Sequence, residues 1–269
     1  MFINNISSSK LNTYRECGLK YKLRYHNRLK PVFNGELNTD ALEYGSFVHR
    51  VFEIGVEADT LAELNEIAKA EKENYKFAPE KLKNFEKMCN NFLKLNSTLK
   101  ETVGTESKFK ICIDKEFDMN INGIIDRVVR SPSGKILVID YKTSKRAKTK
   151  LELYKDDQMK MYAYAATQLY NVPAKDVVVS HFYPHYDKLV AVSYTATELA
   201  IFLQGLKAKL WEIRKKKEPE FVASRNVFCD WCGYKEICPS FNDGVQITHR
   251  INEYKEIQKK SKESSDSKG

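Results

Sequence analysis

The spacing of apolar residues changes along the chain and indicates helices first, then strands, then helices and strands together. Apolar residues recur at helical spacing over residues 42–58 and again after Pro79. The second stretch places five of them on one face: Leu82, Phe85, Met88, Cys89 and Phe92. The charged segment 59–77 is also helix-like, so residues 59–100 are predicted to form a helical insertion.

From about Lys108 the spacing shortens to two, which is typical of strands. Strand-like segments cover residues 108–119, 122–130 and 134–143, with a turn at "SPSG" before the last of them. The remaining segments are predicted as one helix over 154–170, two strands over 176–184 and 188–195, and a helix from about 196 to 217. This order predicts a mixed sheet with helices on both faces.

Composition agrees with a soluble globular protein that has a buried core, because 42% of the 269 residues are hydrophobic and 30% are charged. A formal net charge of +9 favours a polyanionic partner. The longest apolar runs are strand-sized, which predicts no membrane span. The start "MFINNISSSK" lacks the apolar stretch of a signal peptide, so we expect a cytoplasmic chain whose six cysteines are thiols or metal ligands.

Two acids and an amine are predicted to meet beside the "SPSG" turn. Asp126 lies four residues before Arg130, and Asp140 lies five residues after Lys135, so the two carboxylates reach nearly the same level of neighbouring strands. Asp140 and Lys142 project from one face, because residues two apart on a strand share a face. Such a group can hold a divalent cation and orient a water for attack on a phosphodiester.

The segments "GIID", "VIDYKTSK" and "QMKMY", with the cysteines near the end, resemble the RecB-like branch of the PD-(D/E)XK nuclease superfamily. The similarity runs over residues 7–240 and is to the iron-sulfur members, which include CRISPR-associated RecB-like exonucleases and AddB-type nuclease domains. It implies a restriction-endonuclease-like α/β/α core with a mixed central sheet, a helical insertion and a C-terminal iron-sulfur segment. The nuclease domain is expected over residues 1–245, followed by a charged tail over 246–269 that is partly helical and then disordered.

The resemblance also assigns roles to individual residues. It places magnesium or manganese on four residues: His49 of "GSFVH", Asp126, Asp140 and the carbonyl of Tyr141. It implies catalytic roles for five residues: Asp126, Asp140, Lys142, Gln158 and Tyr162. Gln158 and Tyr162 are one helical turn apart, so they share a face. The basic loop that follows Lys142 is expected to bind DNA phosphates through Lys145, Arg146, Lys148 and Lys150.

The cysteines near the end have the spacing Cys-x2-Cys-x5-Cys, formed by Cys229, Cys232 and Cys238. They lack the second pair of a zinc ribbon, so a fourth ligand must come from Cys17, Cys89 or Cys112. The resemblance makes Cys17 that ligand and the metal group a 4Fe-4S cluster, with zinc as the alternative. Three aromatic residues are expected to shield it: Phe228, Trp231 and Tyr234.

Three functional hypotheses follow. The first is an exonuclease that acts on DNA ends or single strands in recombination, repair or phage DNA metabolism. The second is a CRISPR-type processing nuclease, which needs a partner integrase. The third is a non-catalytic iron-sulfur DNA-binding module, or a subunit of a larger complex. The sequence has no "GxxxxGK[ST]" phosphate loop, so a partner helicase would be another chain.

Overall fold

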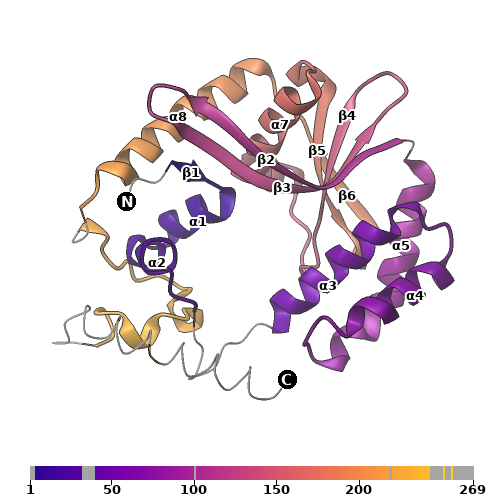
Figure 1. The fold of residues 1–269 in the computed structure, drawn as a ribbon, viewed down its shortest axis with the longest axis horizontal. Helices are drawn as coiled ribbons and strands as arrows, with labels where there is room; N and C mark the ends of the chain where they lie inside the picture. Colours follow the sequence, from indigo (N-terminus) through magenta and orange to yellow (C-terminus); the bar gives the residue numbers. More distant parts are fainter. Residues whose placement is uncertain are drawn as a thin grey trace. The chain divides into compact units, whose positions relative to one another are not determined.

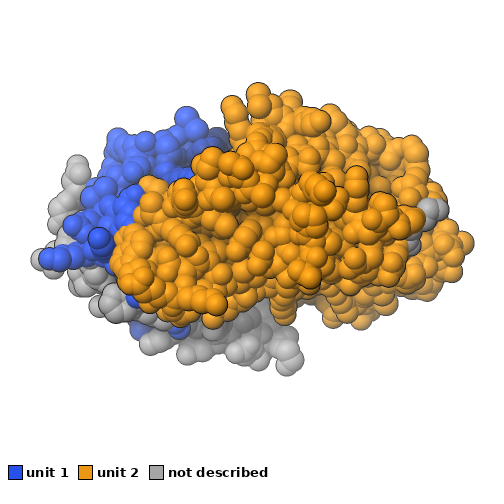
Figure 2. Space-filling view, turned by 90° about the horizontal axis from the view of Figure 1, so that it is seen from above, with its two compact units in different colours: residues 1–3, 9–38, 212–269 blue, residues 4–8, 39–211 orange. Residues whose placement is uncertain are grey.

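The computed structural model describes residues 4–31, 40–99, 101–217 and 220–242, together with Ile251 and Glu256. The chain divides into two compact units, which Figure 2 colours separately. The larger unit contains residues 4–8 and 39–211, and the smaller unit contains 1–3, 9–38 and 212–269. The predicted tail over 246–269 lies outside the described residues, apart from Ile251 and Glu256.

A six-stranded mixed sheet forms the centre of the larger unit, as predicted (Figure 1). Its order is β1-β3-β4-β5-β6, and β2 pairs with β3. The pairs β1·β3 and β4·β5 are parallel, whereas β2·β3, β3·β4 and β5·β6 are antiparallel. The strands are β1 Asn5–Ile6, β2 Glu101–Asp114, β3 Met119–Arg130, β4 Ile136–Tyr141, β5 Val177–Tyr183 and β6 Lys188–Val192.

Three helices pack together beside this sheet: α3 (Asp40–Ile54), α4 (Leu61–Lys72) and α5 (Phe85–Thr98) (Figure 1). Short 3-10 turns, η2 (Gly55–Glu57) and η3 (Pro79–Asn84), follow α3 and precede α5. The buried faces of the helices meet Ile139 and Tyr141 of β4 in one apolar cluster. Within it the rings of Phe52 and Phe92 stack with centroids 4.2 Å apart, which fixes α3 against α5.

The predicted helix over 154–170 is wrong in one respect, because it is two helices, α6 (Lys150–Lys155) and α7 (Asp157–Tyr170). Asp156 between them is extended, and its side chain accepts a hydrogen bond of 2.8 Å from the Gln158 amide. An aspartate in this position caps a new helix, since it satisfies an amide that has no partner within the helix. This cap fixes where α7 begins and therefore where Gln158, its second residue, is placed.

The remaining elements of the larger unit are the 3-10 turns η4 (Ala174–Asp176) and η5 (Pro184–Tyr186) and the helix α8 (Ala196–Lys215), whose last residues enter the smaller unit. Helix α7 packs against β4 and β5, and α6 packs against β6. Among the described residues, none of the helices is both long and apolar enough to cross a membrane.

The smaller unit joins the start of the chain to its end. It contains most of α1 (Ser8–Glu16), α2 (Gly18–Tyr21), the π-helical turn η1 (Lys22–His26), and two 3-10 turns, η7 (Cys229–Trp231) and η8 (Lys235–Ile237). The Tyr234 hydroxyl donates a hydrogen bond of 2.7 Å to the Leu29 carbonyl. A Cβ atom at Gly18 would lie 3.3 Å from the Val222 carbonyl oxygen, so glycine allows these two segments to approach closely.

Candidate functional site

Four titratable side chains lie at one level of four neighbouring strands in the larger unit. Asp140 of β4 pairs in register with His181 of β5. The β3·β4 register, in which Arg127 faces Ile139, places Asp126 opposite Asp140 when it is continued by one residue. The β2·β3 register in the same way places Glu106 opposite Asp126. Strand pairing therefore gathers three acids and a histidine.

Asp126 is held between the strands and helix α3. Its Oδ2 atom accepts a hydrogen bond of 2.7 Å from the Tyr141 amide and lies 3.3 Å from His49 Nδ1. The side chain is thus fixed by the backbone of β4 on one side and by α3 on the other. Burial lowers the pKa of His49, but the hydrogen bond to Asp126 and the charges of Asp126 and Asp140 outweigh it, so the pKa is raised above 6.5.

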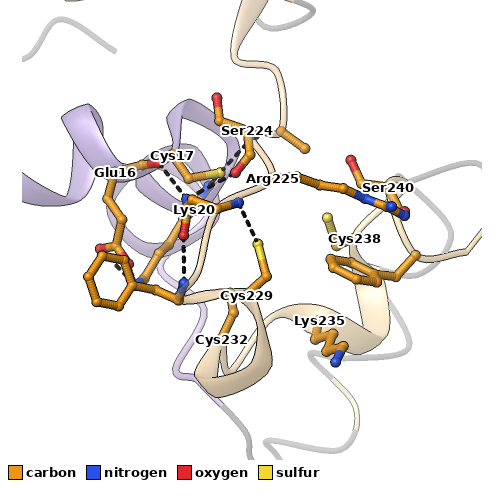
Figure 3. A pocket seen from close by; sticks show the side chains of 14 residues that line it. Glu16, Cys17, Lys20, Ser224, Arg225, Cys229, Cys232, Lys235, Cys238 and Ser240 are labelled. Atoms are coloured by element: carbon orange, nitrogen blue, oxygen red, sulfur yellow. Dashed lines mark hydrogen bonds and ion pairs between the residues drawn. The ribbon is translucent and has the colours of Figure 1, made fainter.

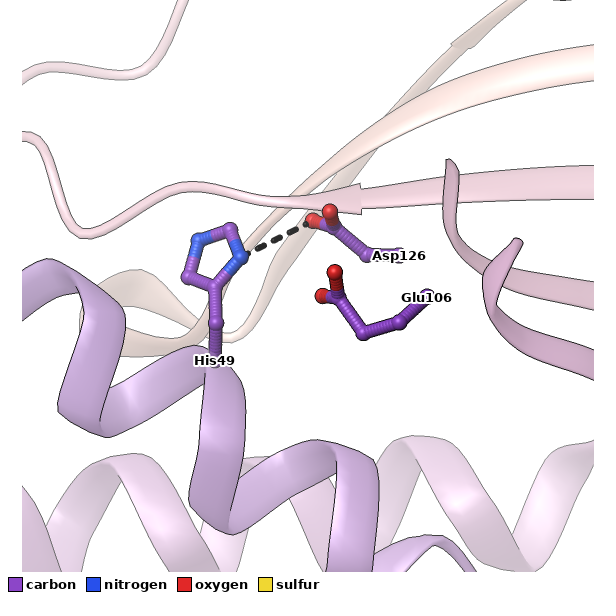
Figure 4. Close-up of side chains that lie close together, drawn as sticks. All are labelled: His49, Glu106 and Asp126. Atoms are coloured by element: carbon purple, nitrogen blue, oxygen red, sulfur yellow. Dashed lines mark ion pairs between the residues drawn. The ribbon is translucent and has the colours of Figure 1, made fainter. Parts of the chain in front are cut away.

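Glu106 joins this pair, although none of the sequence motifs pointed to it. One ligand atom each from His49, Glu106 and Asp126 lies within 4.8 Å of the other two (Figure 4). Glu106 has a φ of 43°, which is unusual for a non-glycine residue inside a strand. Burial and the charge of Asp126 raise the pKa of Glu106. Two carboxylates and an imidazole so close together suit a magnesium or manganese ion.

These three side chains open into a pocket of about 530 Å³ that Arg50, Ile124 and Thr143 also line. Its walls come from α3, β2, β3 and the loop that follows β4. A hollow of this size beside the ligand atoms can admit a phosphate group with its nucleoside.

Asp140 and Lys142 form an ion pair beside this pocket, with 2.5 Å between Lys142 Nζ and Asp140 Oδ2. Asp140 is 2% exposed. Burial raises the pKa of Asp140, and the charge of Lys142 opposes that rise. Burial lowers the pKa of Lys142, but the attraction of Asp140 outweighs it and the pKa is raised. Lys142 therefore stays protonated.

His181, which matched no motif, lies beneath this pair. Its Nε2 atom is 3.8 Å from Asp140 Oδ2, and its Nδ1 atom is 3.1 Å from the Tyr183 hydroxyl oxygen. The imidazole is fully buried, and burial lowers its pKa to about 4. A neutral imidazole of β5 therefore packs against the Asp140 carboxylate.

Helix α7 holds the other side of Lys142. Lys142 Nζ donates a hydrogen bond of 3.3 Å to Gln158 Oε1, and Gln158 Nε2 donates one of 2.9 Å to the Tyr162 hydroxyl. The Tyr162 hydroxyl in turn donates to the Ile124 carbonyl. The structure thus joins Asp140, Lys142, Gln158 and Tyr162 in one chain of contacts.

The four basic residues expected to bind DNA have different surroundings. Arg146 makes two hydrogen bonds to the Glu152 carboxylate, of 2.7 and 3.1 Å. Lys148 pairs with Asp156, and Lys150 is the first residue of α6. Lys145 lines a large pocket next to the site. Carboxylates therefore partly neutralise Arg146 and Lys148, and DNA binding by the four residues stays a prediction.

In the smaller unit, Cys17, Cys229, Cys232 and Cys238 line one pocket (Figure 3). The Cys17 sulfur accepts hydrogen bonds of 3.5 Å from the amides of Lys20 and Ser224, and the Cys229 sulfur accepts one of 3.3 Å from the Asn226 amide. All four are free thiols. The fold therefore brings Cys17 to three cysteines that lie more than two hundred residues later in the chain.

The aromatic residues around this pocket do not all cover it as expected. Tyr234 is buried, whereas Trp231 is 71% exposed and Phe228 is 55% exposed. Phe228 nevertheless lines the pocket together with Phe241. The expectation that Trp231 shields the thiols is wrong, because its ring points into solvent.

Comparison with known proteins adds the family. Residues 5–239 match the PD-(D/E)XK nuclease superfamily. The chain belongs to this superfamily. The restriction-endonuclease-like fold expected from the sequence agrees with this membership and with the mixed sheet.

Curated relatives of this PD-(D/E)XK chain are similar over part of its length. An ATP-dependent helicase/deoxyribonuclease subunit of Streptococcus agalactiae is 29% identical over 155 residues, which are 52% of this chain and 14% of that protein. The protein of the same name from Streptococcus mutans is 25% identical over 199 residues, which are 67% of this chain and 18% of that protein. These relatives agree with the RecB-like branch of the superfamily.

Among solved structures, SSO0001 aligns with 89% of the chain and 88% of its own length, at 18% identity and a TM-score of 0.40.

Proposed function

We propose that the chain is a metal-dependent DNA exonuclease that acts on DNA ends or single strands. The observation that carries this proposal is the convergence of His49, Glu106 and Asp126 within 4.8 Å, next to the Asp140–Lys142 ion pair. Membership of the PD-(D/E)XK superfamily supports phosphodiester hydrolysis as the reaction. The basic charge of the chain supports a nucleic acid as the substrate.

The metal is proposed to be magnesium or manganese. Five groups would hold it: the side chains of His49, Glu106, Asp126 and Asp140, and the carbonyl of Tyr141. The donor set fits, because carboxylates suit both ions and an imidazole is compatible with manganese. When bound, the ion would lower the pKa of a coordinated water and neutralise charge on the phosphate.

Lys142 is proposed to stabilise charge that develops on the phosphate or to orient the attacking water. Its ammonium group stays protonated and is held between Asp140 and Gln158, so its donors point in fixed directions before substrate arrives. Gln158 and Tyr162 are positioning residues in this scheme, because the hydrogen bond between them prevents Gln158 from turning away from Lys142.

The proposal is tested with purified protein, an end-labelled oligonucleotide and either manganese or magnesium. We expect degradation that stops on chelation and falls at least a hundredfold in Asp140→Asn and Lys142→Ala. Glu116→Gln is the matched control, since Glu116 is an exposed acid in the turn after β2. Degradation by Asp140→Asn at the rate of the unsubstituted protein would refute the assignment.

Exonuclease action is tested separately by comparing linear and circular single-stranded DNA of the same sequence. An exonuclease degrades the linear form and leaves the circle intact. Equal degradation of both would show an endonuclease and would retain the metal site. Labels at the 5′ and 3′ ends of the linear form give the polarity.

We further propose that Cys17, Cys229, Cys232 and Cys238 bind a 4Fe-4S cluster. Thiolates are the soft ligands that such clusters take. A tetrahedral zinc site has Zn–S bonds of about 2.3 Å, which puts the sulfurs about 3.8 Å apart. Zinc in the same four thiols is the alternative. The role of the cluster would be structural, since it would join residue 17 to residues 229–238 within the smaller unit.

The cluster is tested by anaerobic purification followed by iron, sulfide and zinc analysis. We expect a brown protein with about four irons per chain. Serine in place of any of the four cysteines should lower the iron content, whereas Cys112→Ser should not, because Cys112 is exposed on β2 and does not line the pocket. A colourless protein with one zinc per chain would establish the alternative.

A helicase chain is proposed as a partner, because the curated relatives are helicase/deoxyribonuclease subunits. A CRISPR-type integrase partner remains the second prediction from the sequence. Degradation of duplex DNA that requires both ATP and an added helicase would support the first of these partners.

A further inference from the structure

A second pocket adjoins the metal-ligand group within the larger unit. It has a volume of about 600 Å³ and shares Ala41 and Thr143 with the pocket that holds the ligand atoms. At this junction α3 has Gly45, where an added Cβ atom would lie 3.7 Å from Thr143 Oγ1. Because the two pockets share lining residues, they adjoin, and together they are called the trough below.

The walls of the second pocket carry three lysines, a histidine and one carboxylate, that of Glu80. Lys81 of η3, Lys87 of α5 and Lys145 of the loop after β4 all line it. Lys81 pairs with Asp40 at 3.2 Å. Lys87 and Lys145 are exposed, and neither has an ion-pair partner among the residues that the structure describes. These two ammonium groups are available to an anion.

An exposed aromatic ring also lines this pocket. Tyr186 of η5 is 49% exposed and lines the pocket beside His185. Its hydroxyl donates to the Lys145 carbonyl, which fixes the ring against the basic loop. Asn91 of α5 donates a hydrogen bond of 2.6 Å to the Pro184 carbonyl, so η5 is also tied to the helix that carries Lys87.

We propose that this trough binds a single strand of DNA on its way to the metal-ligand group. Lys87 and Lys145 contact successive phosphates, and an unstacked base lies on the ring of Tyr186. The strand then passes Gly45 and reaches His49 and Asp126. The bases of a duplex are stacked inside the helix, so an exposed aromatic ring favours single-stranded DNA. This inference rests on the proposed nuclease function and assigns part of its DNA path to the helical insertion.

The charge contribution is measured by the binding of labelled oligo(dT) to the Asp140→Asn chain in EDTA, where no cleavage occurs. Each single-strand phosphate contact contributes a salt-dependence slope of about −0.7, equivalent to about fivefold in affinity at 0.1 M salt. Lys87→Ala with Lys145→Ala should therefore weaken binding about 25-fold and reduce the slope by about 1.4. Lys83→Ala is the matched control, because Lys83 is an exposed lysine of η3 that does not line the pocket.

The base contact is measured with two substitutions of one residue. Tyr186→Ala should weaken oligo(dT) binding about tenfold, because it removes the stacking surface. Tyr186→Phe keeps the ring and should bind within about twofold of the parent. A blunt duplex of equal length should bind more weakly than the single strand and should not respond to Tyr186→Ala.

Two results would overturn the inference. One is an unchanged affinity for oligo(dT) and an unchanged salt dependence in the Lys87 and Lys145 double variant, while the unsubstituted chain still cleaves DNA. In that case the proposed nuclease function stands and the proposed DNA path is wrong. The other is an absence of DNA binding by the parent together with an absence of cleavage by the unsubstituted chain, which removes both proposals.

Discussion

Replacing Glu106 with glutamine should stabilise the metal-free protein and weaken metal binding at the same time. Glu106 and Asp126 have carboxylate oxygens within 4.8 Å. Two unit charges at this distance repel by about 3.5 kcal/mol at an effective dielectric constant of 20 and by about 0.9 kcal/mol in water. Because Glu106 is partly exposed, we expect a gain of about 1–2 kcal/mol for Glu106→Gln. That gain corresponds to a melting temperature about 2–8 °C higher in EDTA.

Manganese should offset this advantage. If glutamine raises the dissociation constant for the ion tenfold, the stabilisation by saturating manganese falls by about 1.4 kcal/mol. The unsubstituted chain should then show a manganese-dependent shift in melting temperature about 3–6 °C larger than the variant. Thermal scans at neutral pH in EDTA and in manganese chloride measure both effects, and Glu116→Gln in the exposed turn should change neither.

The reasoning fails if Glu106→Gln melts below the unsubstituted chain in EDTA. That result would mean that Glu106 makes a favourable contact and does not repel Asp126. Equal manganese shifts in both proteins would instead show that Glu106 takes no part in binding the ion.

Two further substitutions test the surroundings of the site. Tyr162→Phe leaves the Ile124 carbonyl and the Gln158 amide without their partner, so we expect a loss of about 1–3 kcal/mol in urea unfolding and slower cleavage, with unchanged manganese binding. Phe52→Ala removes the ring stacked on Phe92 and should cost about 3–5 kcal/mol in the same unfolding measurement. Equal losses of activity and manganese binding in Tyr162→Phe would contradict its positioning role.

The alternation of residues along β3 and β4 was sufficient to predict the level of the two acids. Both strands leave a short turn, so counting outward from "SPSG" gives the pairing without knowledge of the rest of the fold. Helical spacing likewise identified the buried faces of α3 and α5. These predictions succeeded because each depends on contacts between residues that are near in sequence.

Glu106 could not be placed in this way. The β2·β3 pairing shifts register between Cys112 and Asp114 and again between Thr102 and Gly104, so counting from the turn gives the wrong partner for every residue beyond the first shift. The left-handed conformation of Glu106 also departs from simple alternation. Glu106 and Asp126 lie at about the same number of residues from the turn between β2 and β3, which was the available signal in the sequence. The structure is needed to show that the two residues are opposite one another.

The position of Cys17 is a different case. Its contact with the Cys229 segment closes a loop of more than two hundred residues, and no local pattern reports such a contact. The sequence left three cysteines open as the fourth thiol, and the family resemblance chose among them. The close approach at Gly18, where the Leu19 amide donates a hydrogen bond of 2.9 Å to the Val222 carbonyl, is the physical reason that Cys17 reaches this pocket.

Asp126 has a structural role as the acceptor for the Tyr141 amide, besides its proposed role as a metal ligand. Two substitutions can separate these roles. The described β3·β4 pairs end at Arg127 and Ile139, and two residues further along β4 the Tyr141 amide donates to the Asp126 carboxylate. A buried amide needs a partner, so Asp126→Ala should destabilise the metal-free chain by about 1–3 kcal/mol. Asp126→Asn retains an oxygen acceptor and should lose manganese binding with a much smaller loss of stability. Equal stability of the two variants in urea would show that the hydrogen bond from the Tyr141 amide to Asp126 does not stabilise the junction of β3 and β4.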